Sequence, residues 1–153
     1  MLKNSKIILL DEATSALDNE SQAKIKEVIQ NLKIIDVVIE LLDARIPLAS
    51  RNPDIKRLTQ NKRRIILLNK CDLANETINN KWVSYFSKEA PTILTDSSSG
   101  KGIDKVSKAI DKIMEEEVAK QAARGRINKT IRVMILGIPN VGKSSFINRI
   151  SKK

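Results

Sequence analysis

The stretch that decides the fold is Gly137-Ile138-Pro139-Asn140-Val141-Gly142-Lys143-Ser144, which has the pattern G-x-x-x-x-G-K-S. The apolar run Ile131–Leu136 comes directly before it, and a segment with helical spacing, Ser145–Ile150, comes directly after it. Between a strand and a helix, this pattern predicts a phosphate-binding loop (P-loop), in which backbone N–H groups at a helix start surround an anion. The alternative, a glycine-rich turn without a ligand, does not require eight matched positions.

The polar side chains of this loop have predicted tasks. Lys143 would neutralise β- and γ-phosphate oxygens, Ser144 would contribute its hydroxyl to the octahedral shell of Mg²⁺, and Ser145 would cap toward the α-phosphate. The expected phosphate-binding residues are Gly137, Pro139, Asn140, Val141, Gly142, Lys143, Ser144 and Ser145. The loop therefore predicts a nucleotide-polyphosphate site with Mg²⁺ as its cofactor.

Four more short apolar runs precede the P-loop strand. They are Ile7–Leu10, Val37–Leu42, Ile65–Leu68 and Thr92–Leu94. Because these runs are almost uniformly apolar rather than alternating, both faces of each strand should be covered, as in a parallel sheet. Segments with helical spacing lie between them, for example 25–32 and 103–114. We therefore expect an α/β protein with a three-layer, doubly wound P-loop fold, a five-stranded parallel sheet and ligands at the carboxyl ends of the strands.

A second motif, Asn69-Lys70-Cys71-Asp72 (N-K-x-D), follows the run Ile65–Leu68 directly. The Asp72 carboxylate can accept from both the ring N–H and the exocyclic amine of guanine, whereas adenine offers no matching pair of donors. Ser97 and Ser98 follow the next strand, where a backbone N–H or small side chain could contact the guanine carbonyl oxygen. The predicted guanine-binding residues are Asn69, Lys70, Asp72, Ser97 and Ser98.

The length, amino-acid composition and charge of the chain limit the classes of protein to which it can belong. The 153 residues fit one domain, and 41% hydrophobic with 30% charged residues is a globular composition. One cysteine and no long apolar run predict a cytoplasmic protein without membrane contact. The net charge is +10, yet residues 1–40 hold five basic and seven acidic side chains. The basic excess suits nucleotides or a weak RNA or ribosome contact, and a solvated basic surface explains it equally well.

From about Lys33 onward the chain resembles the circularly permuted ribosome-biogenesis GTPase A (YlqF) type. The resemblance is carried by Asp43-Ala44-Arg45-Ile46-Pro47, Ser50-Arg51-Asn52-Pro53, the N-K-x-D motif and residues 137–148, with the base motif ahead of the P-loop. It implies a GTP-dependent factor of large-subunit assembly. The D-x-x-G motif and the histidine linked to hydrolysis in that family are absent from this sequence. We therefore expect GTP hydrolysis to be slow or absent.

The segment Lys6–Asp18 instead resembles the Walker B strand and D-loop of an ABC-transporter ATPase. That resemblance implies that Asp11 supports Mg²⁺, that Glu12 polarises the attacking water as a catalytic residue, and that Ser15–Asp18 communicates across a homodimer. A buried strand followed by an Asp-capped helix explains the segment equally well. We interpret the chain as an engineered or recombined chimera, one P-loop NTPase-like domain over 1–153, made of an ATPase-like part (1–32) and a GTPase-like part (33–153).

In the expected strand order, 1-5-2-3-4, the first strand lies beside the P-loop strand. This would bring Asp11 within one water of a metal held by Ser144, whereas an ATPase-like gap of two strand spacings would not. The expected function is Mg²⁺-dependent binding of GTP or GDP. Two alternatives stay open at this point: a scaffold with inherited but idle nucleotide motifs, and a ribosome-assembly or rRNA-binding GTPase fragment.

Overall fold

The computed structural model describes residues 7–11, 30, 33–126 and 130–151, which are built around a parallel β-sheet. Four of its strands are β2 (Val37–Asp43), β3 (Arg63–Asn69), β4 (Thr92–Leu94) and β5 (Ile131–Leu136), and they lie in the order β5-β2-β3-β4. The backbone of β1 (Ile7–Asp11) pairs in parallel with β5, which gives the order β1-β5-β2-β3-β4. The α/β class with a parallel sheet, expected from the sequence, is confirmed.

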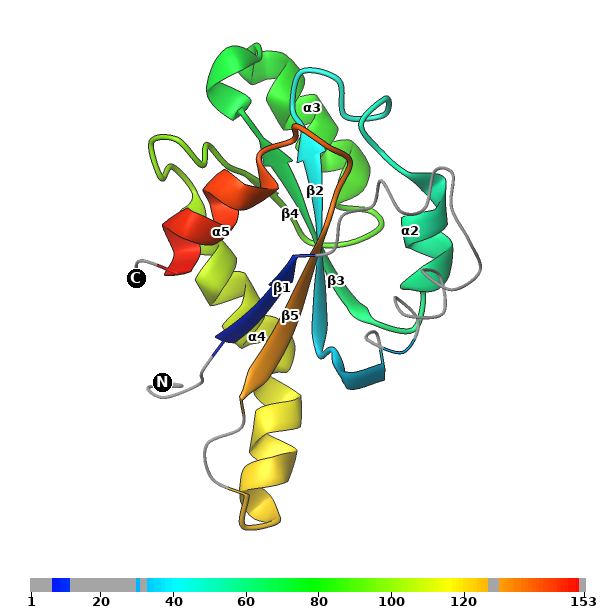
Figure 1. Ribbon diagram of the computed structural model, residues 1–153, viewed down its shortest axis with the longest axis vertical. Helices are drawn as coiled ribbons and strands as arrows, with labels where there is room; N and C mark the ends of the chain where they lie inside the picture. Colours follow the sequence, from blue (N-terminus) through cyan, green and yellow to red (C-terminus); the bar gives the residue numbers. More distant parts are fainter. Residues whose placement is uncertain (1–6, 12–29, 31–32, 127–129, 152–153) are drawn as a thin grey trace.

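Helices cover both faces of this sheet (Figure 1). The described helices are α2 (Pro53–Leu58), the short 3₁₀ turn η2 (Cys71–Leu73), α3 (Glu76–Phe86), α4 (Ile103–Ala123) and α5 (Lys143–Ser151). Helices α4 and α5 pack on one face, and α2 and α3 pack on the other. Because the strands are parallel, they all run toward the same edge of the sheet, where the loops that carry the predicted motifs begin.

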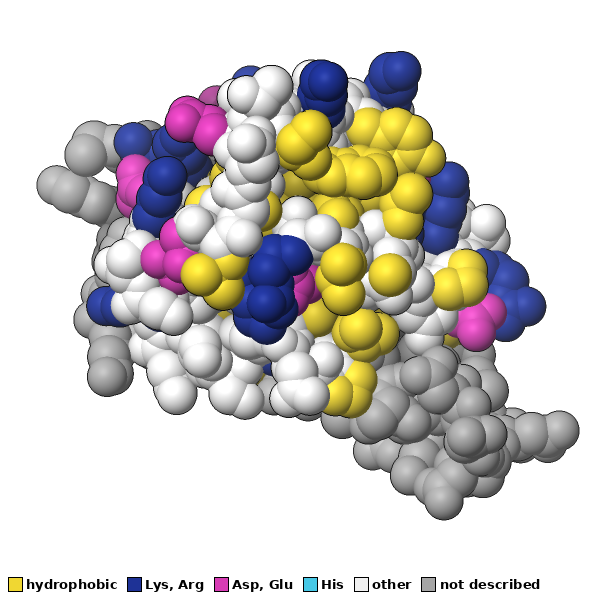
Figure 2. All heavy atoms as spheres, turned by 90° about the horizontal axis from the view of Figure 1, so that it is seen from above, with side chains coloured by type: hydrophobic (Ala, Val, Ile, Leu, Met, Phe, Trp, Pro, Cys, Tyr) yellow, Lys and Arg dark blue, Asp and Glu magenta, His cyan; other side chains and the backbone are white. Residues whose placement is uncertain are grey.

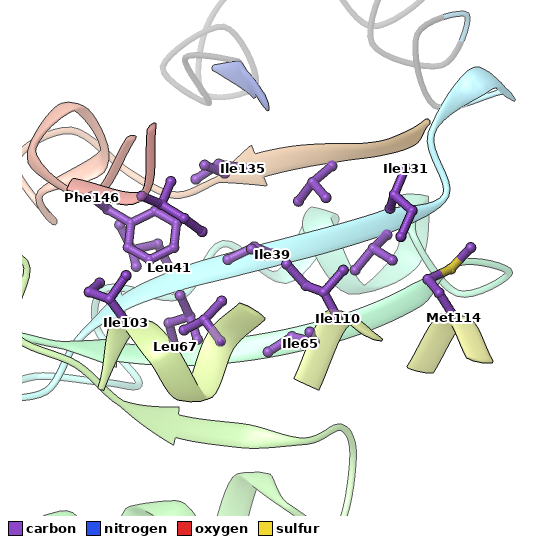
Figure 3. Packing of buried hydrophobic residues seen from close by; sticks show 14 of the residues in the cluster. Ile39, Leu41, Ile65, Leu67, Ile103, Ile110, Met114, Ile131, Ile135 and Phe146 are labelled. Atoms are coloured by element: carbon purple, nitrogen blue, oxygen red, sulfur yellow. The ribbon is translucent and has the colours of Figure 1, made fainter. Parts of the chain in front are cut away.

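The largest apolar cluster lies between the sheet and the α4–α5 layer (Figure 3). Helix α4 presents Ile103, Val106, Ile110 and Met114 at helical spacing, and all four are fully buried. Alternate residues of β2, β3 and β5 meet them, and Phe146 of α5 closes the cluster near the P-loop. Burial of Phe146 thus fixes the helix that follows the P-loop against the sheet.

The opposite face contains a buried charge network. Glu40 of β2 is 0% exposed and accepts from Arg51 Nε at 3.0 Å. Arg51 also pairs with Glu89, which in turn pairs with Arg64. Burial raises the pKa of Glu40 against the opposing charges of the two arginines. This network connects the loop after β2 to β3 and to the segment after α3.

The predictions for the segment 25–32 and for the aromatic residues of α3 are not all confirmed by the structure. The expected helical segment 25–32 lies, apart from residue 30, outside the described residues. Trp82, Tyr85 and Phe86 fall at helical spacing, which favours core-facing positions for all three; Phe86 is buried and Trp82 packs against the same cluster, but Tyr85 is 53% exposed. Tyr85 is instead held edge-on against both neighbours at ring distances of 5.7 and 5.1 Å. Among the described residues, no helix is long and apolar enough to cross a membrane.

Candidate nucleotide-binding site

Four loops meet at the carboxyl edge of the sheet, one after each of β2, β3, β4 and β5 (Figure 1). The register places Asp43, the last residue of β2, opposite Asn69, the last residue of β3. Strand β5 ends beside β2, with Leu136 opposite Glu40, and the P-loop that follows reaches Asn69 and Lys70 through Val141 and Asn140. The sheet thereby assembles at one edge two motifs that lie about seventy residues apart in sequence.

Asn69 connects three of these loops through its buried amide. Its Nδ2 donates to the carbonyl of Val141 in the P-loop at 2.8 Å. Its Oδ1 accepts from Thr95 Oγ1 at 3.3 Å and from the backbone N–H and the hydroxyl of Ser97 at 3.1 and 2.8 Å. The two ends of the side-chain amide therefore hold the loops together. Asn69 thus supports the N-K-x-D loop, residues 69–72, from inside the protein.

Lys70 forms a second connection between the base loop and the P-loop. Its Nζ donates to Asp43 Oδ2 at 3.1 Å and to the carbonyl of Asn140 at 2.6 Å. Its backbone is in the left-handed region at φ 61°, which is uncommon for a residue with a side chain. Asn140, its partner, also has a positive φ of 66°. Two strained residues in contact at one edge are typical of a functional site.

The buried Asp43 carboxylate forms an ion pair with the Lys70 ammonium. Its side chain is 6% exposed and accepts from Arg45 Nε at 2.9 Å and Arg45 Nη2 at 2.7 Å, a bidentate pair. Hydrogen bonding by Arg45 is the main cause that holds the pKa of Asp43 well below its usual range, and Lys70 adds to it. Asp43 is therefore charged at neutral pH and bridges two cations.

The P-loop curls around the ammonium of Lys143. Lys143 Nζ donates to the carbonyls of Gly137 at 2.7 Å and Ile138 at 3.3 Å. Gly142 has φ +97°, and a Cβ added there would lie 2.5 Å from Asn69 Nδ2. Gly142 is therefore required both for the backbone turn and for the close approach of Asn69. Val141 is buried in the main core, which fixes the middle of the loop.

The remaining predicted P-loop residues lie on the outer side of this turn. Pro139, Asn140, Ser144 and Ser145 are exposed, and the two serines occupy the first turn of α5. Asp72 is also exposed, in η2, and its negative charge acts on Arg45. Asp72, Ser144 and Ser145, which are predicted to contact a ligand, are thus accessible, whereas Asn69, which is predicted to support the base, is buried.

The loop 96–100 after β4 is held from two sides. The Asp96 carboxylate accepts from the backbone N–H groups of Ser98 at 2.8 Å and Ser99 at 3.2 Å. On the other side, Arg149 of α5 donates from Nε to the Ser97 carbonyl at 3.2 Å and from Nη2 to the Ser98 carbonyl. Ser97 is buried and Ser98 is exposed.

The predicted contribution of the N-terminal segment is not tested by this geometry. The backbone of Asp11 pairs with Ile135 of the P-loop strand, and its side chain lies outside the described part of the chain, as does all of Glu12. Within the described residues, no group of three or more His, Cys, Asp or Glu side chains is arranged to hold a metal ion. Ser144 is the described side chain predicted to hold Mg²⁺.

Three residues that join the loops at this edge were missing from the predicted site: Asp43, Thr95 and Arg149. Asp43 ends a buried strand of the parallel sheet, and that position alone was a signal for a site residue. Thr95 comes directly after β4, at the same edge of the sheet. Arg149 gave no such signal, because an arginine in the last turn of a helix is ordinarily explained by the helix dipole.

The carboxyl edge also exposes apolar side chains, seen beside basic ones in Figure 2. Five large apolar residues of the loops and helices near this edge are between 45% and 60% exposed. They are Ile46, Leu48, Leu73, Ile78 and Tyr85.

A parallel α/β sheet with a G-x-x-x-x-G-K-S loop braced against an N-K-x-D loop defines a P-loop fold of the GTPase type. Comparison with known proteins agrees. A family model described as 50S ribosome-binding GTPase matches residues 132–153. Ribosome biogenesis GTPase A of Bacillus licheniformis is 45% identical over 129 residues, which are 84% of this chain and 46% of that protein.

More distant relatives and a solved structure show the same similarity. Guanine nucleotide-binding protein-like NSN1 of Arabidopsis thaliana is 32% identical and aligns with 94% of this chain and 28% of its own length. The crystal structure of GNP-bound YlqF from T. maritima matches with a TM-score of 0.61 and 30% identity, over 86% of this chain and 49% of that chain. The chain is thus homologous to ribosome biogenesis GTPases of the YlqF type.

The chain spans about half the length of the ribosome biogenesis GTPase A relatives. The ATPase-like origin of residues 1–32 and the chimeric, engineered nature of the chain stay predictions.

Proposed function

We propose that this protein binds guanine nucleotides, GTP or GDP, together with Mg²⁺ at the carboxyl edge of its sheet. The observation that carries the proposal is the contact of Asn69 with the P-loop and with Ser97, which joins the base loop, the P-loop and the loop after β4 in one hydrogen-bonded unit. A nucleotide has phosphates that a P-loop binds and a base that an N-K-x-D loop can recognise. The braced loops therefore suit a ligand that has both.

Asp72 is the residue that would select guanine. It is exposed at the start of the turn after β3, where its carboxylate can accept from the two adjacent N–H donors of the base. The buried Asn69 and the Lys70 brace would hold that turn in place. Ser97 and Ser98 would approach the carbonyl side of the base. Adenine presents the opposite donor and acceptor pattern and would leave Asp72 without a partner.

The phosphate end of the site would be formed by the P-loop. Backbone N–H groups at the start of α5 and the Lys143 ammonium would receive the β- and γ-phosphates, because Lys143 can exchange the carbonyls of Gly137 and Ile138 for phosphate oxygens. Mg²⁺ would neutralise phosphate charge. A single described hydroxyl, that of exposed Ser144, fits one oxygen position of its shell, so the nucleotide itself would supply most of the others. Asp11 is proposed as a further support.

Hydrolysis is proposed to be slow or absent. The sequence contains no histidine and no D-x-x-G motif, and Glu12 is the one candidate we put forward for polarising water. Steady-state phosphate release from GTP should therefore stay close to the uncatalysed background, and Glu12→Gln should remove any excess. A rapid turnover that Glu12→Gln leaves unchanged would contradict this part of the proposal.

The test of guanine recognition is an exchange of hydrogen-bond direction at Asp72. Asp72→Asn replaces an acceptor by a donor, so affinity should shift from GTP toward xanthosine triphosphate, whose base carries a carbonyl in place of the amine. Equilibrium titration should show GTP binding weakened at least about tenfold and xanthosine triphosphate binding strengthened, by the loss of about one paired hydrogen bond. Lys143→Ala should weaken both nucleotides alike.

If Asp72→Asn leaves the order of affinities unchanged, the base is not read at this loop. If the unaltered chain binds neither GTP nor GDP, the alternative of an idle nucleotide scaffold holds instead. An rRNA-binding role for the basic surface is a separate alternative, which would show as RNA binding that falls steeply with salt and is indifferent to Lys143→Ala.

A further inference from the structure

Arg149 connects the helix that follows the P-loop with the loop after β4. It lies in the last turn of α5, and its guanidinium donates to the carbonyls of Ser97 and Ser98, about fifty residues away in sequence. The guanidinium also lies beside Gly100, where an added Cβ would be 3.5 Å from Arg149 Nε. One side chain therefore fixes two successive carbonyls of the same loop.

The direction of these carbonyls decides where the loop's donors point. No cis peptide bond occurs in the described residues, and in a trans peptide the N–H points opposite to the C=O of the same unit. Because Arg149 draws the Ser97 and Ser98 carbonyls toward α5, the N–H groups of Ser98 and Ser99 must point away from α5. There they meet the Asp96 carboxylate, which accepts from both.

The same loop is fixed toward the base motif by another residue. The N–H and hydroxyl of Ser97 donate to Asn69, which begins the N-K-x-D motif. Ser98, the next residue, is exposed beside this contact and carries two donors, a hydroxyl and an N–H that can be shared between two acceptors. Arg149 and Asn69 together leave the Ser98 backbone with one orientation.

Arg149 has an electrostatic effect on this loop as well. Hydrogen bonding by Ser99 is the main cause that lowers the pKa of Asp96, and the positive charge of Arg149 adds to it. A carboxylate close to the carbonyl side of a base would repel that oxygen, and the adjacent guanidinium offsets the repulsion.

We propose that Arg149 is a positioning residue for guanine specificity, which orients the Ser97–Ser98 peptide so that Ser98 donates to the 6-oxo group of the base. The proposal rests on the guanine binding proposed above. It assigns to α5, the helix of the phosphate loop, a role in reading the base. The residue that touches the base is Ser98, and Arg149 acts through it.

The experiment compares two triphosphates that differ at the 6-position. GTP has the 6-oxo group, whereas 6-thioguanosine triphosphate carries sulfur there, a much weaker acceptor, and keeps both the ring N–H and the amine read by Asp72. Dissociation constants of both are measured, with Mg²⁺, for the unaltered chain, Arg149→Ala and Arg149→Lys. Arg132→Ala is the matched control, because Arg132 is exposed on β5 away from this loop.

The expected result for Arg149→Ala is about tenfold weaker GTP binding, one hydrogen bond's worth, with less than a twofold change for the analogue. Arg149→Lys, which cannot hold both carbonyls with a planar fork, should lie in between. Arg132→Ala should change neither constant. A merely structural role of Arg149 would weaken both nucleotides by the same factor, and that outcome overturns the proposal.

The outcomes also separate this inference from the function on which it rests. An unaltered chain that fails to bind GTP overturns both. An unaltered chain that binds GTP more tightly than the analogue, with a preference that survives in Arg149→Ala and Arg149→Lys, overturns the role of Arg149 alone. If Arg149→Ala does not fold, as judged by its thermal unfolding, the ratio measured with Arg149→Lys decides.

Discussion

Replacing Asp43 by asparagine should destabilise the protein and loosen the base loop from the P-loop. The substitution keeps the size of the side chain but removes the charge that Arg45 and Lys70 share. A hydrogen bond to a charged group contributes about 1.5–3 kcal/mol where it is shielded. Arg45 is 46% exposed and Lys70 26%, so water replaces part of each bond. We expect a net loss of about 1–3 kcal/mol, or about 2–10 °C in melting temperature.

The pH dependence identifies Asp43 as the cause. Its folded pKa is depressed below the ordinary value of 3.8, so its contribution is fully present above that pH and is lost as pH falls below it. The difference in unfolding free energy between the unaltered chain and Asp43→Asn should therefore be constant from pH 7 to about 5. It should close as the pH falls through 3.8 toward the depressed value. Urea unfolding at several pH values measures it.

Asp54→Asn is the matched control for this experiment. Asp54 also pairs with an arginine, Arg57 at 3.2 Å, but the two side chains are 45% and 76% exposed. An exposed pair of this kind contributes less than about 0.5 kcal/mol. If Asp43→Asn is no more destabilising than Asp54→Asn, or if its effect persists unchanged at low pH, the buried bridge from Asp43 to Lys70 does not stabilise the site as described.

Three further predictions concern the same framework. Gly142→Ala should lower the unfolding free energy, measured with urea, by several kcal/mol, because the added Cβ would meet Asn69 Nδ2. Gly125→Ala is the control: with φ +76° and open space around it, this change should cost only about 1–2 kcal/mol of backbone strain. Equal costs for the two variants would refute the close packing of Gly142 against Asn69. Asn69→Ala should lower the melting temperature by about 4–12 °C and abolish GTP binding, since it leaves the Val141 carbonyl and Ser97 donors buried without their partner; near-normal affinity would contradict the brace. Glu89→Gln should lower the unfolding free energy at pH 7 by about 1–2 kcal/mol. Hydrogen bonding by Arg51 lowers the pKa of Glu89 from 4.5 to about 2, so the difference in unfolding free energy should vanish as the pH falls from 4.5 to about 2. A difference that stays constant over this pH range would exclude the ion pair as its source.

The sequence was sufficient to predict those features in which a local pattern has one physical meaning. Almost uniformly apolar runs such as Val37–Leu42 favour strands covered on both faces, and β2 is buried along its whole length. The pattern around Gly142 and Lys143 required a loop between a strand and a helix, which is where the structure has it. The parallel sheet, and the edge of it that carries the P-loop, followed from these segments.

Features that depend on contacts between distant segments could not be predicted. Nothing local in Arg149 indicates that its guanidinium reaches Ser97, because that contact requires α5 and the loop after β4 to lie side by side. Likewise the exposure of Tyr85 depends on Phe86 occupying the core position, and helical spacing alone permits either arrangement. The contribution of Asp11 depends on a side chain beyond those described.

The most direct measurement of the central claim is thermal unfolding of the chain in Mg²⁺ with GTP, with ATP or without nucleotide. Ligand at a hundred times its dissociation constant adds about 2.7 kcal/mol to the apparent stability, which is about 5–10 °C for a chain of this size. A guanine site formed by Asp72 and the P-loop predicts this shift with GTP, little or none with ATP, and no shift with either nucleotide in Lys143→Ala. An unchanged melting temperature in GTP, or equal shifts with GTP and ATP, would contradict it.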